Sequence, residues 1–360
     1  MELWFNISTG VRVVKSKRNK TIDFSLADAP ADVMARIIQA KKKESFSLEQ
    51  VTDKVINGDS FQVMDQLPSH SIDLALVDPP YNLNKKYDGM TFKQMKPAEY
   101  QRYTEDWINK LKPLLKASAS VYVFADWETS IVLAPVLEQH FTIKNRITWQ
   151  REKGRGALTN WKNSSEDIWF LTVDPHDYVF NVDQVKQRRP VVAPYKEDGH
   201  AKDWQATKAG NFRDTMPSNL WDDISIPYWS MPENTDHPTQ KPEKLMAKVI
   251  LASSNPGDLI FDPFAGAGSS LVTAKKLGRH FIGIEQSLLY CAWGQYRLNK
   301  ANNDPHIQGY ADGVFWPRNS LSLQKKYLKE KDNSTPRLDH YRVTAEFERQ
   351  RASFMIWPER

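Results

Sequence analysis

The sequence of 360 residues contains one cysteine, no long apolar run and no internal repeat. A single cysteine excludes an internal disulfide and suits a reducing compartment. No cysteines and histidines have the spacing of zinc ligands, so we expect no metal site. No stretch reaches the roughly 18 consecutive apolar residues of a membrane span. The N-terminus lacks the basic region and apolar core of a signal peptide, and we therefore expect a cytoplasmic protein.

The net charge of +5 is small for this length, but its distribution is uneven. Residues 1–50, 144–218 and 313–360 are basic, whereas the rest of the chain is acidic. An acidic body with basic flanks suits a polyanionic substrate such as nucleic acid. Ordinary solvated surface charge explains the same distribution. Charge alone therefore does not decide the function.

Strand and helix patterns alternate over most of the chain. This alternation predicts an α/β fold, with a doubly wound, mostly parallel sheet and helices on both faces. Two of the expected strands, 146–149 and 167–172, have no helix between them, which predicts a hairpin at the sheet edge. The other expected strands are 54–59, 72–77, 120–124, 258–264 and 280–285, and the expected helices are 31–43, 60–67, 97–116, 128–139, 242–253, 269–277 and 287–300.

Changes in composition divide the chain into five segments. Residues 174–235 are rich in proline, tryptophan and charge, so we interpret them as an inserted recognition region. Residues 82–97 are polar and predict a long loop. The five segments are an N-terminal extension of unknown role (1–50), a first catalytic half (51–173), the inserted region (174–235), a second half (236–312) and a basic, weakly patterned tail (313–360).

The second half contains a small-residue turn, Phe261–Gly268, after an apolar run. Gly266 and Gly268 let backbone N–H groups and a helix N-terminus approach a ligand closely. Leu271 stands where the dinucleotide fingerprint has its third glycine, so NAD is a poor fit. Glu285 ends the next expected strand, where a carboxylate can accept both ribose hydroxyls. The turn predicts a nucleoside-type cofactor; a purely structural turn is the alternative.

The first half contains the tetrapeptide Asp78-Pro79-Pro80-Tyr81 after the apolar run 74–77. Exocyclic amino groups of bases are poor nucleophiles because the nitrogen lone pair is delocalised into the ring. The Asp78 carboxylate and the Pro79 carbonyl can accept hydrogen bonds from such an amino group and localise its lone pair, and Pro80 helps to fix the backbone. Tyr81 offers a face for stacking. A strand-ending turn without catalytic function is the alternative reading of this motif.

Together these two motifs resemble the amino-methylating DNA methyltransferases, which use S-adenosylmethionine on adenine N6 or cytosine N4. Their order, with the substrate motif first and a recognition region between the motifs, is similar to the beta group of that family. The resemblance implies a Rossmann-like methyltransferase fold and sequence-specific methylation of a base flipped out of double-stranded DNA. In that group aspartate at the position of Asp78 usually accompanies adenine, so adenine N6 is favoured and cytosine N4 is the alternative.

The same resemblance implies roles for further residues. Asp59 matches a position that contacts the adenine of the cofactor, although it also suits the cap of the helix that follows. Thr239 and Lys241 lie in a segment that helps to hold the methionine carboxylate, and the acidic residue of the glycine turn contacts the methionine portion. The complete implied cofactor set is Asp59, Thr239, Lys241, Asp262, Phe264, Gly266, Gly268 and Glu285.

Basic residues between the motifs, interleaved with aromatic ones such as Trp161, suit phosphate contact and base stacking. Each of them taken singly also suits a solvated surface. The predicted DNA contacts are Lys85, Lys86, Arg151, Lys153, Arg155, Lys186, Arg188 and Arg189. Cys291 lies in an apolar helix and is expected in the core, which disfavours cytosine C5 methylation because that reaction needs a thiolate.

Two further functions stay open at this point, namely an RNA methylase and a DNA-binding protein with an idle methylase fold. Intact motif residues argue against the idle fold, and a small-molecule methyltransferase is disfavoured by the long basic insert. A homodimer and a partner restriction endonuclease are compatible with the resemblance, and neither has a signal of its own in the sequence.

Overall fold

The computed structural model describes residues 16–42, 45–151, 159–191, 196–207 and 210–334. The chain divides into two compact units. The first consists of Met1–Arg188 and Thr215–Arg318, and the second of Arg189–Asp214 and Asn319–Arg360. In the described part of the chain no helix is long and apolar enough to cross a membrane.

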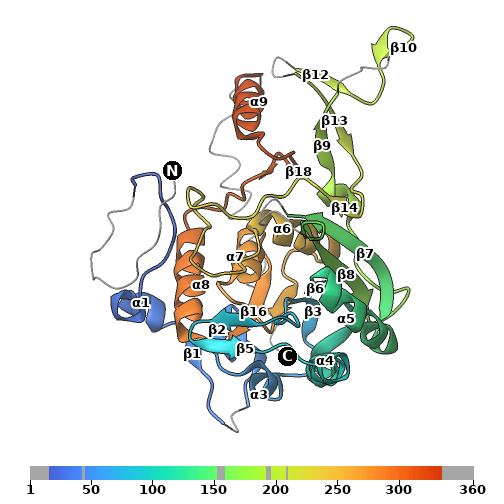
Figure 1. The fold of residues 1–360 in the computed structure, drawn as a ribbon. Helices are drawn as coiled ribbons and strands as arrows, with labels where there is room; N and C mark the ends of the chain where they lie inside the picture. The colour runs from blue at the N-terminus through green and yellow to red at the C-terminus, as the bar shows by residue number, and fades with distance from the viewer. Residues whose placement is uncertain (1–15, 43–44, 152–158, 192–195, 208–209, 335–360) are drawn as a thin grey trace, which may run out of the picture. The chain divides into compact units, whose positions relative to one another are not determined.

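A single large sheet organises the first unit (Figure 1). Neighbouring strands are parallel except at β8, which runs antiparallel to β6 and β7. The predicted mostly parallel sheet is therefore confirmed. The strands, in spatial order, are β1 (Ile38–Gln39), β2 (Lys54–Asn57), β16 (His280–Glu285), β15 (Leu259–Asp262), β3 (Ile72–Val77), β6 (Leu115–Ala125), β8 (Ser165–Thr172), β7 (Thr142–Gln150) and β14 (Leu220–Trp221).

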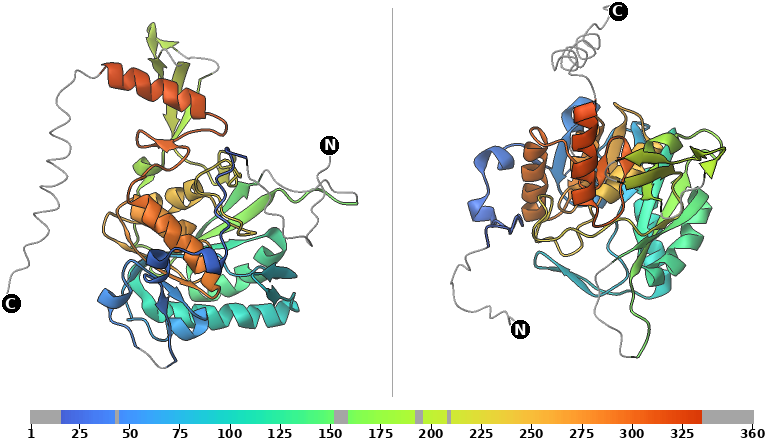
Figure 2. Two further views of the ribbon diagram at one scale, coloured as in Figure 1. Left: turned by 90° about the vertical axis from the view of Figure 1, so that its left-hand side faces the viewer. Right: turned by 90° about the horizontal axis from the view of Figure 1, so that it is seen from above.

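Helices cover both faces of this sheet, as Figures 1 and 2 show. The reason is visible in β3, where Leu74 and Leu76 pack into one apolar cluster and Ala75 and Val77 into another. A strand buried on both faces needs helices on both sides. The first cluster contains residues of α6 (Glu243–Ser253), α7 (Ser269–Lys276) and α8 (Leu288–Ala301), and the second contains residues of α3 (Ser60–Met64), α4 (Pro97–Leu111) and α5 (Trp127–His140).

Strands β3 and β15 are direct neighbours at the centre of the sheet. Leu74 pairs with Ile260, and Ala75 with Phe261, in parallel register. The carboxyl ends of parallel strands meet at one edge of a sheet, where α/β folds commonly bind ligands. The register therefore brings the two sequence motifs, which follow β3 and β15, to the same edge.

The residues predicted as a long loop, 82–97, contain a hairpin. Its strands are β4 (Lys85–Tyr87) and β5 (Met90–Phe92), and they pair in antiparallel register. Asp88 and Gly89 form the turn with φ values of 40° and 80°, a conformation that favours aspartate and glycine. The prediction was wrong here because strands of three residues are too short to show a clear hydrophobic alternation.

Three other expectations need correction. The helix expected over 31–43 is the single turn α1 (Ala31–Met34), because Ile38 and Gln39 pair with β2 as strand β1. The hairpin of β7 and β8 exists, but β8 lies inside the sheet and the short β14 forms its edge. The helix expected over 97–116 ends at Leu111, and a 3₁₀ turn that contains Pro113 follows it, because proline removes a helix donor.

The tail beyond residue 313 is more regular than expected. In the first unit β17 (Tyr310–Ala311) and β18 (Val314–Phe315) pair antiparallel. In the second unit α9 (Leu321–Ser334) follows, and Tyr327 packs edge-on against Phe212 of strand β13 (Gly210–Thr215) at 6.0 Å between ring centroids. The remaining short elements are α2 (Leu48–Val51), β9 (Gln187–Pro190), β10 (Lys196–Glu197), β11 (His200–Ala201) and β12 (Gln205–Thr207).

Residues 189–214 of the predicted inserted region belong to the second unit, whereas residues 174–188 and 215–235 belong to the first. Strands β12 and β13 pair as an antiparallel hairpin within the second unit. The role of this region in target recognition stays a prediction.

Candidate active site

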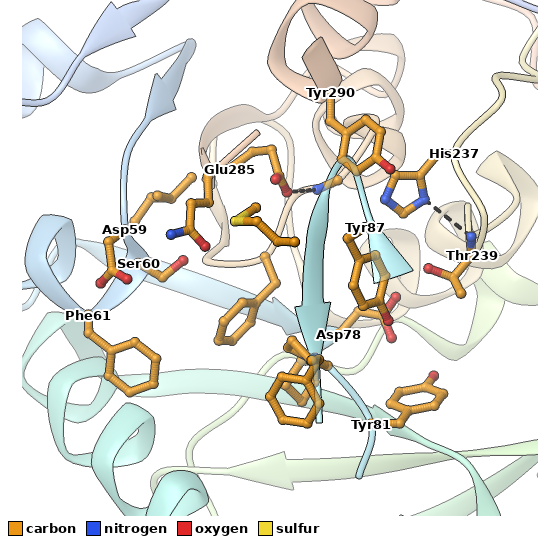
Figure 3. Close-up of a pocket in the computed structure, with 18 of the residues that line it drawn as sticks. Asp59, Ser60, Phe61, Asp78, Tyr81, Tyr87, His237, Thr239, Glu285 and Tyr290 are labelled. Carbon is orange, nitrogen blue, oxygen red and sulfur yellow. Dashed lines mark hydrogen bonds between the residues drawn. The ribbon is translucent and has the colours of Figure 1, made fainter. Parts of the chain in front are cut away.

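A cavity of about 370 Å³ opens at the carboxyl edge of the sheet (Figure 3). Segments that follow β2, β3, β15 and β16 line it, together with the β4–β5 hairpin. Both sequence motifs therefore contribute to one cavity. Its lining residues are Asp59, Ser60, Phe61, Asp78, Pro79, Pro80, Tyr81, Tyr87, Met90, Thr91, Phe92, Tyr103, His237, Thr239, Lys241, Phe264, Gly266, Ile284, Glu285, Gln286 and Tyr290.

The glycine turn after β15 forms one wall of the cavity. Gly266 and Gly268 have φ values of 51° and 71°, a region that L side chains rarely adopt. A Cβ atom on Gly266 would lie 3.1 Å from Nε2 of His237, and one on Gly268 would lie 3.1 Å from Cα of Gly294. Glycine is needed at both positions for the backbone conformation and for close packing.

Glu285 sits at the end of β16 and holds this turn. Its Oε2 accepts the N–H of Gly266 at 2.9 Å, and its Oε1 accepts the N–H of Ser287 at 2.8 Å. Burial raises the pKa of Glu285 above its ordinary value, and these backbone N–H groups oppose that shift. The carboxylate lines the cavity, as expected for a group that meets ribose hydroxyls, but that contact stays a prediction.

Asp262 and Gly268, two predicted cofactor residues, are not among the lining residues of the cavity. The Asp262 carboxylate accepts the N–H of Phe264 at 3.0 Å and the hydroxyl of Ser270. Burial raises the pKa of Asp262 to about 7. Asp262 therefore stabilises the turn through its hydrogen bonds to Phe264, which lines the cavity, and to Ser270.

Asp59 combines the two readings that the sequence allowed. Its side chain accepts the N–H of Gln62 at 3.2 Å and caps helix α3. The same residue lines the cavity, opposite the Asp78 end in Figure 3. Capping does not exclude a ligand contact, because a carboxylate has acceptor sites beyond one hydrogen bond.

Asp78 follows β3 directly, and its carboxylate carries an ion pair that the sequence did not suggest. The Nζ atom of Lys241 lies 2.8 Å from Oδ1 and 2.7 Å from Oδ2 of Asp78. Burial raises the pKa of Asp78, and Lys241 opposes that rise. The turn itself is fixed from α4, where the hydroxyl of Tyr100 donates to the carbonyl of Pro80 at 2.9 Å.

Glu166 and Arg151 complete this group, and the role of Glu166 was missed in the sequence. The Tyr81 hydroxyl donates to Oε2 of Glu166 at 3.1 Å, and Nζ of Lys241 lies 3.4 Å from the same atom. Arg151 holds Oε1 of Glu166. The available signal was a pair of acidic residues at the start of a strand that is otherwise apolar, since a buried carboxylate needs partners.

Lys241 was expected to hold the methionine carboxylate of a cofactor. The structure instead places its ammonium on the Asp78 and Glu166 side of the cavity. Burial lowers the pKa of Lys241, but the two carboxylates outweigh this effect and keep the amine charged. A contact of Lys241 with the cofactor stays a prediction.

His237 lines the cavity beside Tyr290 and Thr239 (Figure 3). Its Nδ1 accepts the N–H of Thr239 at 3.3 Å, and its ring meets Tyr290 edge-on at 4.4 Å between centroids. Burial lowers the pKa of His237 to about 3, so the ring is neutral at pH 7. Tyr87 of the hairpin lies between His237 and Asp78 in Figure 3. The rings of Tyr87, His237 and Tyr290 thus line the cavity together.

The predicted DNA contacts fall into different environments. Lys86 is exposed, and Lys85 is half-buried with a pKa that burial and then the charges of Arg151 and Lys241 lower. Arg151 is partly exposed and pairs with the buried Glu166. Lys153 and Arg155 lie outside the described residues.

The remaining predicted DNA contacts lie in or next to strand β9. Lys186 is half-buried and pairs with Asp183 at 2.8 Å, and Arg189 is exposed on the second unit. The prediction that Arg188 contacts DNA was wrong. Its side chain is 6% exposed, pairs with Asp312 at 3.3 Å and lies over the Trp316 ring at 5.3 Å. It packs within the protein and is unsuited to phosphate contact.

Cys291 is fully buried in the core, as predicted, and packs in the same apolar cluster as α6 and α7. Burial raises the pKa of its thiol well above the ordinary value. A buried, protonated thiol is a poor nucleophile.

The sequence pattern of the DNA methylase family, which covers adenine N6 and cytosine N4 methylation, matches residues 72–295. The matched stretch includes both motifs and most of the residues that line the cavity; Asp59, Ser60 and Phe61 lie before it. The chain belongs to this family. As an N6/N4 DNA methylase it is an amino DNA methyltransferase, its substrate is DNA, and its family depends on S-adenosylmethionine.

Individual relatives agree with this assignment. The methylase is 33% identical to the DNA adenine methyltransferase YhdJ of Escherichia coli (strain K12) over 251 residues, which cover 69% of this chain and 83% of the relative. It is 31% identical to the type II methyltransferase M.HpaI of Haemophilus parainfluenzae over 252 residues, which cover 69% and 75%.

The fold of this N6/N4 methylase is also found among solved structures. The cytosine-N4-specific PvuII DNA methyltransferase matches it with a TM-score of 0.52 and 18% identity, over 69% of this chain and 90% of that one. At this identity the likeness shows the fold and not the target base.

Proposed function

We propose that this DNA methyltransferase transfers a methyl group from S-adenosylmethionine to N6 of an adenine that is flipped out of double-stranded DNA, at a specific sequence. The observation that carries the proposal is the meeting of both motifs in one cavity, with Asp78 at one end and Glu285 at the other. Aspartate at the first motif position favours adenine, and a relative at 33% identity is named as an adenine methyltransferase.

The cavity has the features that this cofactor requires. Gly266 leaves space for close approach, and the Glu285 carboxylate can accept ribose hydroxyls. The Asp59 carboxylate also lines the cavity and can accept a hydrogen bond from an adenine amino group. Phe264 and Thr239 also line the cavity. When bound, the cofactor supplies an electrophilic methyl group on a positively charged sulfur.

The other end of the cavity has acceptors for the target base. An ionised Asp78 accepts hydrogen bonds from the amino group and localises its lone pair. The Tyr81 ring contributes an apolar face, and its hydroxyl is held by Glu166 and Lys241. Flipping the base into this position costs a few kcal/mol of unstacking. The proposed phosphate contacts are the exposed Lys86, Lys186 of the first unit and Arg189 of the second unit.

The test is transfer of labelled methyl from S-adenosylmethionine to unmethylated duplex DNA, followed by digestion and mass identification of the product. N6-methyldeoxyadenosine is expected. N4-methyldeoxycytidine would overturn the adenine assignment. Transfer to RNA in preference to DNA, or cofactor binding without any transfer, would favour the RNA methylase or the idle fold. The homodimer and the partner nuclease stay predictions.

A further inference from the structure

Four charged side chains meet at the Asp78 end of the cavity. They are two carboxylates, Asp78 and Glu166, and two cations, Lys241 and Arg151. The side chains of Lys241 and Glu166 are only 5% and 4% exposed. Burying such charges is costly unless each has a partner of opposite sign, and here the charges balance.

The pairing within this group conflicts with the proposed reaction. Both carboxylate oxygens of Asp78 lie within 2.8 Å of the Lys241 ammonium. The target amino group needs one of these oxygens as an acceptor. Each oxygen keeps a second acceptor site, but an ammonium held on both oxygens draws their charge toward itself and weakens them as acceptors. Full acceptor strength at Asp78 therefore requires Lys241 to give up part of its contact when the base enters.

A second carboxylate, that of Glu166, lies close enough to pair with the Lys241 ammonium when it moves from Asp78. Oε2 of Glu166 lies 3.4 Å from Nζ of Lys241, whereas Arg151 holds the other oxygen, Oε1. Arg151 and the Tyr81 hydroxyl thus fix the Glu166 carboxylate in place. The lysine ammonium sits on a flexible stem and has three donors, so a small movement transfers it from one carboxylate to the other.

We propose that Lys241 is a counter-ion shared by Asp78 and Glu166, and that Glu166 is the positioning residue that retains Lys241 when the target amino group replaces it on Asp78. This inference rests on the proposed function. Glu166 touches neither base nor cofactor in it; it acts through Lys241.

The physical reason is charge balance. If Lys241 left the site entirely, Asp78 would lose its ion-pair partner and the buried Glu166 would keep only Arg151. A neutral base would not compensate for the lost cation. If Lys241 stayed fixed on Asp78, that carboxylate would be a weaker acceptor. A shared counter-ion keeps the site neutral and frees Asp78 for the amino group.

The pH dependence of transfer reports on this arrangement, because Asp78 must be ionised to accept the amino hydrogens. Glu166 raises the pKa of Asp78, and Lys241 lowers it. The titratable and charged groups around Asp78 and its partners are Lys241, Glu166, Tyr81, Arg151, Lys85, Tyr87, Tyr100, His237 and Asp262.

The experiment compares single-turnover methyl transfer in wild type, Glu166→Gln and Lys241→Met over the acidic pH range. The rate of transfer falls at low pH as Asp78 is protonated, and this fall is the acidic limb of the pH–rate profile. Removing the negative charge of Glu166 should shift the acidic limb to lower pH, and removing the cation of Lys241 should shift it to higher pH, each by about one pH unit. In Glu166→Gln the maximal rate should fall at least about tenfold, with the Kd for S-adenosylmethionine within about twofold of wild type.

Two further variants separate positioning from stability. Glu166→Asp keeps the charge and should restore the wild-type limb. Asp223→Asn removes another buried carboxylate, which pairs with Lys244 at 2.8 Å and Lys248 at 2.6 Å outside the cavity lining. It should lower the Tm without moving the limb.

Limbs that stay in place, or that move in the same direction in Glu166→Gln and Lys241→Met, would overturn the shared counter-ion and leave the methyltransferase assignment standing. Wild-type protein that binds the cofactor but transfers no methyl to DNA would overturn the proposed function and this inference with it.

Discussion

Replacing Gly266 by alanine tests whether the glycine turn forms the cofactor wall. The residue has φ of 51°, and an L side chain in this region costs about 1 kcal/mol. The added Cβ would also lie 3.1 Å from Nε2 and 3.2 Å from Cε1 of His237. The ring has little freedom to retreat, because Tyr290 packs against it and Thr239 donates to its Nδ1.

The contact adds a second cost to the backbone strain. Overpacking of this kind costs about 1–3 kcal/mol, and relief by rotation of His237 would push the ring into the cavity. We therefore expect Gly266→Ala to lower the free energy of unfolding by about 2–4 kcal/mol. The affinity for S-adenosylmethionine should fall by at least about tenfold.

Gly278→Ala is the matched control. Gly278 has a similar φ of 72°, but an added Cβ would meet nothing within 4 Å, and the residue is not part of the cavity lining. This variant should lose only about 1 kcal/mol of stability and keep the wild-type affinity. Urea unfolding and titration calorimetry measure both quantities. Equal losses in the two variants, or unchanged cofactor affinity in Gly266→Ala, would refute the placement of the cofactor against this turn.

Asp78→Ala should lower the rate of methyl transfer by about 10²-fold or more, while calorimetry finds cofactor binding largely intact. Lost cofactor binding with retained turnover would contradict the role of Asp78. Asp223→Asn should cost about 3 kcal/mol of stability. Burial raises the pKa of Asp223, but Lys248 and Lys244 outweigh this and hold it below its ordinary value. The stability that Asp223 supplies is thus present above pH 4 and lost as the pH falls further, and urea unfolding at pH 7 and pH 3 should show a mutant deficit at pH 7 that shrinks at pH 3. Lys186→Ala and Arg189→Ala, tested singly, should each reduce the salt slope of DNA binding by about 1. Arg188→Ala should leave that slope unchanged, because its buried guanidinium packs on Trp316.

Much of the fold could be predicted from short stretches of the sequence. The apolar runs of β3, β6 and β15, and the 3.6-residue periodicity of α4 and α8, each lie within a few consecutive residues, so their elements could be predicted. The hairpin at 85–92 and strand β1 escaped prediction because they are short and gain their partners from elsewhere. Pairing with a distant strand leaves no periodic signal in two or three residues.

The sequence by itself determined which chemistry the site carries. Each motif lies within a few consecutive residues. Residues 78–81 contain a carboxylate followed by two prolines, and residues 261–268 contain a turn with glycines suited to positive φ. It also placed Glu285 at a strand end, where the structure finds it holding the N–H of Gly266.

Only the tertiary structure decided which side chains share charge. Glu166, Lys241 and Asp78 come from three distant segments, and their ion pairs exist because the sheet register and the chain's return after β14 bring them within 3.4 Å. The same packing buried Arg188 and Asp262. Interactions between charges depend on distance in space and on burial, and neither quantity is encoded in any single stretch of chain.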